Sequence, residues 1–162
     1  MKFIDRHSAD ATDTWLLQPD SEIAGPAPRR LLTLVQWQAV RTAWPTTVPV
    51  GVLLPNTADV EELADDLPRI ALIALEFPKW VDGRAYSQAH VLRARLHFAG
   101  EIRATGEVLV DMMPLLQRTG FDAVVLREGE RRSSAERALG FFPEYYQGDV
   151  LQPLPRFARQ AA

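Results

Sequence analysis

The sequence predicts an α/β fold, a single domain of about four βα units around a mainly parallel sheet. From residue 46 onward, short continuous apolar runs alternate with helical segments, which is typical of βαβ units whose sheet is buried on both faces. The length of 162 residues is that of about one domain, and a content of 47% hydrophobic and 24% charged residues indicates a globular core. Such units are compatible with a small open sheet or with a half-barrel, and the sequence leaves this choice open.

The N-terminal residues are expected to form a short β/α attachment packed on this domain. Residues 3–4 and 14–17 are short apolar pieces that indicate strands, and a proline-rich connector ends at Pro28. Thr33 and Gln36 have capping-box spacing. The chain is thus divided into the attachment at 1–45, the α/β domain at 46–147 and a C-terminal tail at 148–162.

The elements follow from periodicity and capping residues. Strands are predicted at residues 48–54, 70–75, 101–105 and 122–126. Helices are predicted at residues 34–44, 58–67, 85–97 and 108–118, and a fifth from residue 133. Thr57 is the expected cap of the second helix, Ser133 and Glu136 suggest a capping box for the fifth, and Pro114 is tolerated only in a first turn. The tail is interpreted as a surface strap, with a partner-binding extension as the alternative.

Composition excludes several classes of function. A formal net charge of −3 and a pI near 5.6 provide no field that attracts nucleic acid or an anionic membrane. The absence of cysteine excludes disulfides, thiolate catalysis and cysteine-ligated metals. The charged N-terminus lacks the apolar region of a secretion signal, and no run reaches membrane-spanning length. We therefore expect a cytoplasmic protein that binds neither nucleic acid nor membrane.

The loop after the predicted strand at 70–75 is the main candidate site, because parallel strands place binding groups at their carboxyl ends. Lys79 and Arg84 lie near the predicted start of a helix, where an anion is favoured, and Asp82 would orient Arg84 or cap the helix. Trp80 and Tyr86 suggest either a lid on a pocket or an interface anchor. The plainer alternative is that Asp82 is only a cap, Gly83 only a turn residue, and the two cations a solvated rim.

A catalytic centre is not evident from the sequence. There is no Gly-x-Ser-x-Gly elbow, glycine-rich phosphate loop or dinucleotide fingerprint. Glu76 and Asp82 are weak candidates for acid–base catalysis, Glu76 through burial beside Phe77 and Trp80. His90 and His97 are seven positions apart, too far along a helix to share one ion without a third ligand, so no metal is predicted. No cofactor is predicted either, and whether the protein is an enzyme is left open.

The run from Phe77 to Ala89, followed by residues 92–95 and 100–104, resembles the domain of unknown function 934 family of bacteria. The likeness extends over about residues 45–147. Members of that family are often labelled as oxidoreductases involved in sulfite reduction, and their genes typically neighbour those of sulfite reductase. The resemblance implies that the motif positions are functional: Lys79, Asp82, Gly83, Arg84, Tyr86, Ser87, Arg93 and Arg103. Met112 stands where the family usually has glutamine.

The resemblance implies a cytoplasmic accessory protein of assimilatory sulfite reduction. Its expected partner is sulfite reductase or the electron donor of that enzyme, or its ligand a sulfur oxyanion, with Lys79, Arg84 and Arg103 as positive contacts. Two alternatives stay open, a small α/β enzyme acting on an oxyanion at its strand ends and an atypical flavin- or nicotinamide-dependent oxidoreductase. The oligomeric state is not predicted. The binding residues expected for either ligand or partner are Lys79, Trp80, Asp82, Gly83, Arg84, Tyr86, Ser87, Arg93 and Arg103.

Overall fold

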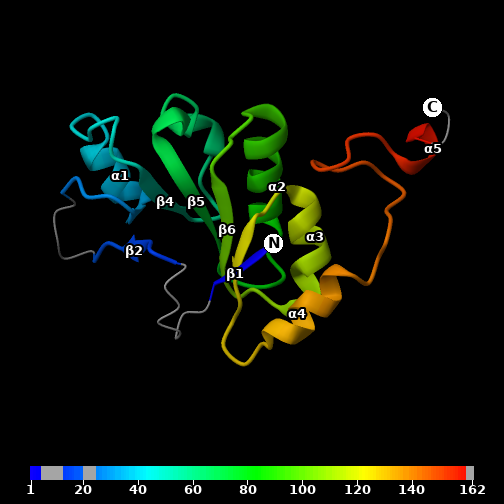
Figure 1. Cartoon of the computed structure of the whole chain (residues 1–162). Helices are drawn as coiled ribbons and strands as arrows, with labels where there is room; N and C mark the ends of the chain where they lie inside the picture. The colour runs from blue at the N-terminus through cyan, green and yellow to red at the C-terminus, as the bar shows by residue number, and fades with distance from the viewer. Residues whose placement is uncertain (5–12, 20–24, 160–162) are drawn as a thin grey trace.

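The computed structural model in Figure 1 describes residues 1–4, 13–19 and 25–159. Its centre is one sheet with the strand order β1-β7-β6-β5-β4-β3-β2, in which every pair of neighbours is parallel. The strands are β1 (Lys2–Ile4), β2 (Leu16–Leu17), β3 (Arg30–Thr33), β4 (Val50–Leu54), β5 (Ile70–Phe77), β6 (Glu101–Gly106) and β7 (Ala123–Val125).

The strand order explains the shape of the domain. From β2 to β7 each strand is added beside the previous one in the same direction, and β1 pairs with β7 at the far edge. Crossovers between parallel strands are right-handed, so a sheet that grows in one direction carries its helices on one face. The α/β prediction is therefore confirmed, and the sheet is a curled, open half-barrel whose other face carries no helix layer among the described residues (Figure 1).

The connections contain short helices. The α-helices are α1 (Leu34–Val40), α2 (Arg84–His90), α3 (Met113–Thr119), α4 (Arg132–Leu139) and α5 (Arg156–Arg159). Tighter or wider turns are η1 (Val60–Leu63), η2 (Leu67–Arg69), η3 (Val91–Arg95) and η4 (Val110–Met112), of which η3 is a π-helix that continues α2. In the described part of the chain no helix has both the length and the apolar character to cross a membrane.

Local sequence signals set the start of α1 and the end of α3. The Thr33–Gln36 capping box is present, with the Gln36 N–H donating to Thr33 Oγ1 at 3.3 Å and the Thr33 N–H donating to Gln36 Oε1 at 2.9 Å. Pro114 lies in the first turn of α3, as expected, and α3 ends at Gly120, whose φ of 101° is the left-handed geometry of a helix cap.

Some predicted elements were wrong. The helix expected over 58–67 is replaced by η1 and η2, and Asp59, not Thr57, caps η1. Pro68 within η2 disfavours α-helical geometry in the residue before it, which keeps this connection irregular. The capping box expected at Ser133 is absent, because α4 begins at Arg132 with Arg131 as its N-cap.

Helix lengths and one strand also differ from expectation. The helix predicted over 34–44 ends at Val40, and Trp44 folds back so that its indole N–H donates to the Val48 carbonyl at 2.9 Å. Strand β3 was not predicted, because its four residues begin with a charge and follow a proline-rich segment directly. The strands at residues 3–4 and 14–17 are present as β1 and β2.

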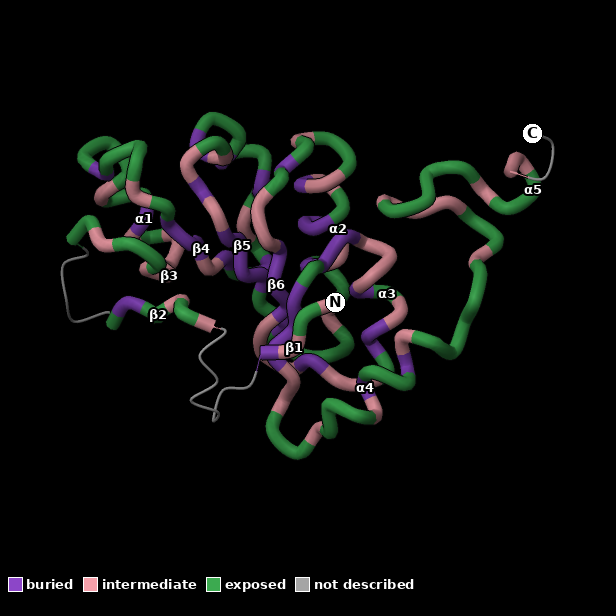
Figure 2. Tube along the Cα trace, in the orientation of Figure 1, coloured by how far each residue is buried: buried purple, intermediate pink, exposed green. Residues whose placement is uncertain are grey.

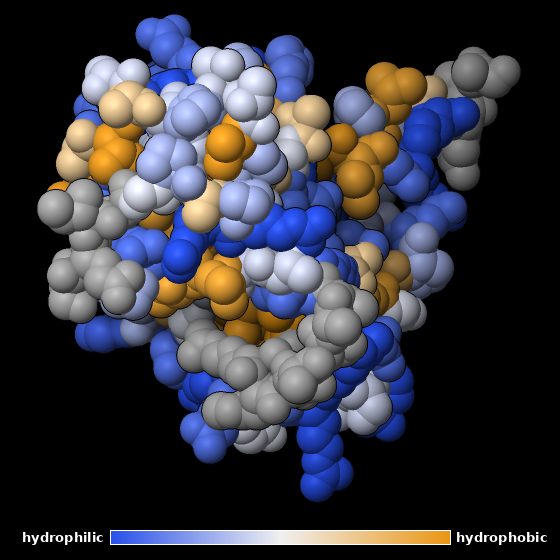
Figure 3. Space-filling model, turned by 60° about the vertical axis from the view of Figure 1, so that its left-hand side comes forward, coloured by the Kyte–Doolittle hydropathy of each residue, from blue (hydrophilic) through white to orange (hydrophobic). Residues whose placement is uncertain are grey.

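The two faces of the sheet are covered differently. On the helix face, strand residues such as Leu32, Val52 and Ile73 join one large buried cluster with Trp37 and Leu116. On the opposite face Ile4, Ala123 and Val125 form a separate small cluster, and Leu72 and Ala74 are buried outside the large one. The buried strands stand out at the centre of Figure 2, and Figure 3 shows a hollow in the surface with hydrophobic side chains at its floor.

Candidate functional site

The loop after β5 is organised by one ion pair. Arg84, the first residue of α2, donates from Nε to Asp82 Oδ1 at 3.0 Å and from Nη2 to Asp82 Oδ2 at 2.6 Å. Its backbone N–H also donates to Asp82 Oδ1 at 3.3 Å. The hydrogen bonds from Arg84 hold the pKa of Asp82 well below its usual range, and the same pairing raises the pKa of Arg84. Asp82 thus orients Arg84 and accepts the backbone N–H of the first residue of α2, whose N-cap is Gly83.

This ion pair fixes a loop that exposes apolar surface. The Asp82 N–H donates to the Lys79 carbonyl at 3.0 Å, which closes a turn around Trp80 and Val81. Trp80 is 56% exposed and Val81 64% exposed, so neither belongs to the core. Lys79, Gly83 and Ser87 are exposed beside them. The loop is therefore an apolar tip on a base held by the Asp82–Arg84 pair, and more than half of the Trp80 side chain is exposed.

Two buried amide side chains lie behind the loop. Gln88 of α2 donates from Nε2 to the Pro55 and Ala58 carbonyls at 3.0 and 2.8 Å, which anchors the turn after β4 to the helix. Asn56 in that turn is 6% exposed and faces Asp82 closely enough to contribute to its lowered pKa. Among the described residues, however, no acceptor meets hydrogen-bond geometry with Asn56 Nδ2, and no donor meets it with Gln88 Oε1. Gln88 was not predicted as a site residue; its amide on an otherwise apolar helix stripe was the available signal.

Tyr86 supports the loop from inside the fold. Its ring packs edge-on against Phe77 at a centroid distance of 5.1 Å and against Phe121 at 6.4 Å. Burial of the phenol raises the pKa of Tyr86 to about 12, from an ordinary value of 10.0. Tyr86 is therefore a packing residue that joins α2 to β5, and its hydroxyl is neutral at physiological pH.

The candidate catalytic carboxylate Glu76 is exposed at the end of β5 and pairs in register with Thr105 of β6. It thus lacks the burial beside Phe77 and Trp80 that the acid–base hypothesis invoked. Farther along this edge, Arg127 Nη1 contacts Glu107 Oε2 at 3.2 Å. The carboxyl ends of the strands therefore do bring charged groups to one edge, but several of these groups are already paired with one another.

Arg93 lies away from the loop and links several backbone segments through hydrogen bonds. It donates from Nε to the Gly120 carbonyl at 3.0 Å and from Nη1 to the Gly100 carbonyl at 2.8 Å. It also contacts the Phe98 carbonyl and the Asp122 carboxylate. These contacts tie the π-helix η3 to the segments before β6 and β7, so Arg93 has a structural explanation.

Arg103 lies in a third location, on the face of the sheet without helices. It is 3% exposed and belongs to β6, an interior strand between β5 and β7. Its Nη1 and Nη2 donate to Asp13 Oδ2 and Oδ1 at 2.8 and 3.0 Å, and its Nε donates to Glu101 Oε1 at 2.8 Å. The three arginines among the expected binding residues, Arg84, Arg93 and Arg103, are thus held in three separate sets of contacts.

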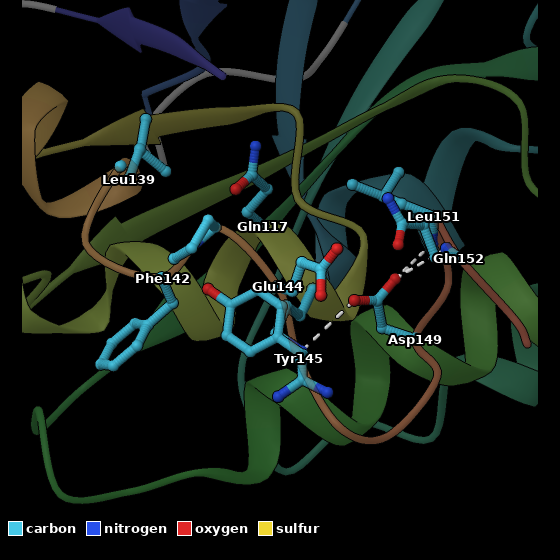
Figure 4. A pocket seen from close by; sticks show the side chains of 11 residues that line it. Gln117, Leu139, Phe142, Glu144, Tyr145, Asp149, Leu151 and Gln152 are labelled. Carbon is cyan, nitrogen blue, oxygen red and sulfur yellow. Dashed lines mark hydrogen bonds and ion pairs between the residues drawn. The ribbon is translucent and has the colours of Figure 1, made fainter. Parts of the chain in front are cut away.

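The C-terminal tail lines two open cavities. Figure 4 shows one of about 340 Å³, between the end of α3, the end of α4 and the tail. There Arg118 lies 4.1 Å from the centre of the Tyr145 ring and donates from Nε to Asp149 Oδ2 at 3.3 Å. The other, of about 500 Å³, is lined by His90, His97 and the tail. Across residues 1–4, 13–19 and 25–159, no three His, Asp or Glu side chains are grouped closely enough to hold a metal ion.

Comparison with known proteins identifies a family but no close relative. No curated protein and no solved structure matches the chain. A family model described as a bacterial protein of unknown function, DUF934, matches residues 51–157, which includes β4 to β7, the loop after β5 and most of the C-terminal tail. Because the match covers well over half of the chain, this protein belongs to the DUF934 family.

Proposed function

We propose that the protein is a cytoplasmic accessory protein of assimilatory sulfite reduction that binds a redox partner through the loop after β5. The observation that carries the proposal is the exposure of Trp80 and Val81 on a loop whose base is fixed by the Asp82–Arg84 pair. Aromatic anchors on pre-organised surfaces supply much of the binding energy in protein interfaces.

The choice of partner comes from the family resemblance. Genes of the family typically neighbour those of sulfite reductase, and the chain has no cysteine and no recognisable dinucleotide motif. The redox groups would then be those of the partner, which is sulfite reductase or the protein that donates electrons to it. The present protein would contribute a docking surface and no redox group.

The loop favours a protein over a small sulfur oxyanion as its ligand. The guanidinium of Arg84 already meets Asp82 in bidentate geometry, so an anion at this place would have to compete with a carboxylate of the same turn. Among the described residues none forms an ion pair with Lys79, which leaves one ammonium group for an anion at this place. A single exposed charge binds an anion weakly in water, whereas the apolar tip suits a protein surface.

A binding experiment with purified sulfite reductase and its electron donor tests the proposal. We expect Trp80→Ala to weaken binding at least about tenfold, the range of an interface anchor. Phe142→Ala is the matched control, because Phe142 is 57% exposed but lies in the segment that follows α4. Unchanged affinity in Trp80→Ala, or loss only in Phe142→Ala, would move the docking surface away from the loop.

Growth experiments test the pathway independently. A bacterium that encodes the protein and carries a deletion of its gene should grow poorly on sulfate or sulfite and normally on sulfide or cysteine. Complementation with the wild-type gene should restore growth, and complementation with Trp80→Ala should not. Equal growth of the deletion strain on all four sulfur sources would contradict a role in sulfite reduction.

A further inference from the structure

The contact between Arg103 and Asp13 joins strand β6 to the N-terminal segment. Arg103 is on β6, and Asp13 lies 90 positions earlier in the chain. The two nitrogens of the guanidinium fork face the two oxygens of the carboxylate at 2.8 and 3.0 Å. This is the planar, two-point geometry with which arginine recognises carboxylates and other oxyanions.

The charges around Arg103 show that Asp13 supplies a required anion. Glu101 of the same strand contacts Arg103 Nη2 at 2.7 Å, and Lys2 of β1 lies 3.8 Å from Glu101. Without Asp13 this group would contain two cations and one carboxylate. A guanidinium that is 3% exposed then lacks half of its compensation, and an uncompensated buried charge is costly. The buried guanidinium therefore needs an anionic group at the place taken by Asp13.

Within residues 13–19, the segment that brings Asp13 to the sheet is held by Trp15, by the short strand β2 and by the buried side chain of Gln18. Trp15 lies against Gly51, where an added Cβ would be 3.1 Å from two of its ring carbons. Strand β2 has two residues, Leu16 and Leu17, and both side chains are exposed. It adds to the edge of the sheet through β3 alone. A two-residue edge strand with exposed side chains opens at low cost in free energy.

Arg103 and the N-terminal segment that contacts it also differ in their relation to the family match. Glu101 and Arg103 lie within the matched region, residues 51–157, whereas Asp13, Trp15 and β2 precede it. The domain that defines the family thus carries the guanidinium, and the N-terminal segment carries the carboxylate that fills the site.

We infer that Arg103 forms a binding site for a small oxyanion and that Asp13 is a built-in occupant which such a ligand displaces. The ligand class is an anion that presents two oxygens side by side, as a carboxylate or sulfite does. Its binding would replace the Asp13 carboxylate on Arg103 and release Trp15 from Gly51. The inference rests on the proposed function only for the choice of sulfite as the first anion to test.

The first test measures the fluorescence of Trp15 in a chain that carries one substitution. The chain has four tryptophans, of which Trp37 and Trp44 are buried, so Trp80→Phe leaves Trp15 as the solvent-accessible reporter. Titration with sulfite, sulfate or acetate at constant ionic strength should shift Trp15 emission to longer wavelength with saturation, and chloride should not. Hydrogen exchange at the Leu16 and Gln18 amides, which bond to the Arg29 and Leu31 carbonyls, should accelerate over the same concentration range.

Variants separate displacement from a merely structural ion pair. Asp13→Ala removes the internal competitor and should tighten sulfite binding by about tenfold or more, measured by calorimetry. Arg103→Lys keeps the charge but loses the fork, and should abolish the emission response. Asp82→Ala is the matched control, because it opens an Arg–Asp pair that is exposed to water and should create no comparable anion site.

Two experimental results would contradict the inference. Anion binding by Asp13→Ala without any response of the Trp80→Phe chain would overturn displacement, because the native segment would then stay in place. No binding by Asp13→Ala, with a native circular dichroism spectrum, would overturn the site itself. The proposed docking function fails separately, since it is measured with a protein partner and depends on Trp80, whereas this inference is measured with inorganic anions and depends on Arg103.

Discussion

The indole Nε1 of Trp37 donates to Oδ2 of Asp66 at 3.0 Å, which connects α1 to the turn that precedes β5. The same carboxylate accepts from Arg69 at 2.5 Å and from Arg41 at 3.2 Å. Burial by itself raises the pKa of Asp66, but the hydrogen bonds from Arg69, Trp37 and Arg41 outweigh it, so the pKa lies below the ordinary value of 3.8. This contact fixes the edge of the sheet that carries β2 and β3.

Asp66→Asn should therefore change the acid stability of the protein. A carboxylate whose pKa is lowered by folding stabilises the native state above its unfolded pKa, near 4, and this contribution is lost as the pH falls below that value. We expect the variant to be less stable at pH 7 by about 1–3 kcal/mol and to approach the wild type towards pH 3. Urea unfolding across this range measures the effect. Asp65→Asn, a neighbouring exposed site, should stay within about 0.5 kcal/mol; a constant gap at all pH values for Asp66→Asn would contradict the assignment.

Tyr86 should determine part of the alkaline stability. Folding raises its pKa from 10.0 to about 12, so its stabilising contribution is complete below pH 10 and is lost as the pH rises towards 12. Tyr86→Phe should lose less stability than the wild type over this interval. Ultraviolet titration of the phenols should show one tyrosine that resists ionisation and disappears in the variant. The exposed Tyr146→Phe is the control, and loss of the resistant step there would contradict the assignment.

Gly106 should be intolerant of a side chain. It has a φ of 90°, and an added Cβ would lie 2.4 Å from the Phe77 carbonyl oxygen. Gly129 has a similar φ of 87° but nothing within 4 Å of its Cβ position, so it isolates the cost of the conformation. We expect Gly129→Ala to cost about 1–2 kcal/mol and Gly106→Ala about 2 kcal/mol more, by chemical denaturation. Equal effects would show that the chain at Gly106 can move away from Phe77.

Arg93→Lys should affect stability and leave partner binding unchanged. Lysine cannot reach the Gly100 and Gly120 carbonyls together with Asp122, so about 2 kcal/mol of stability should be lost. Arg95→Lys is the control, because Arg95 pairs with Glu61 in an exposed position and should change stability by less than about 0.5 kcal/mol. A loss of partner affinity in a stably folded Arg93→Lys protein would instead make Arg93 part of the docking surface.

Part of the structure of the loop after β5 could be predicted from residues that are close together in the sequence. Asp82 and Arg84 are two positions apart, so their pairing and the start of α2 follow from residues that are neighbours in the chain. The exposure of Trp80 could not be read from the sequence, because a tryptophan beside a buried strand is compatible with core, lid or interface. The structure decides this by directing the turn between Lys79 and Asp82 into solvent.

By itself, the sequence determined the α/β class, the strands at β4 to β7, the Thr33–Gln36 cap and the position of the loop, because apolar runs, cap spacing and turn residues act over a few positions. Only the tertiary structure decided that β1 pairs with β7, that the helices share one face, and that Asp13 meets Arg103. These contacts join residues far apart in the chain. They form because the sheet grows in one direction and leaves an open face, where a buried arginine needs a carboxylate that its own strand does not fully supply.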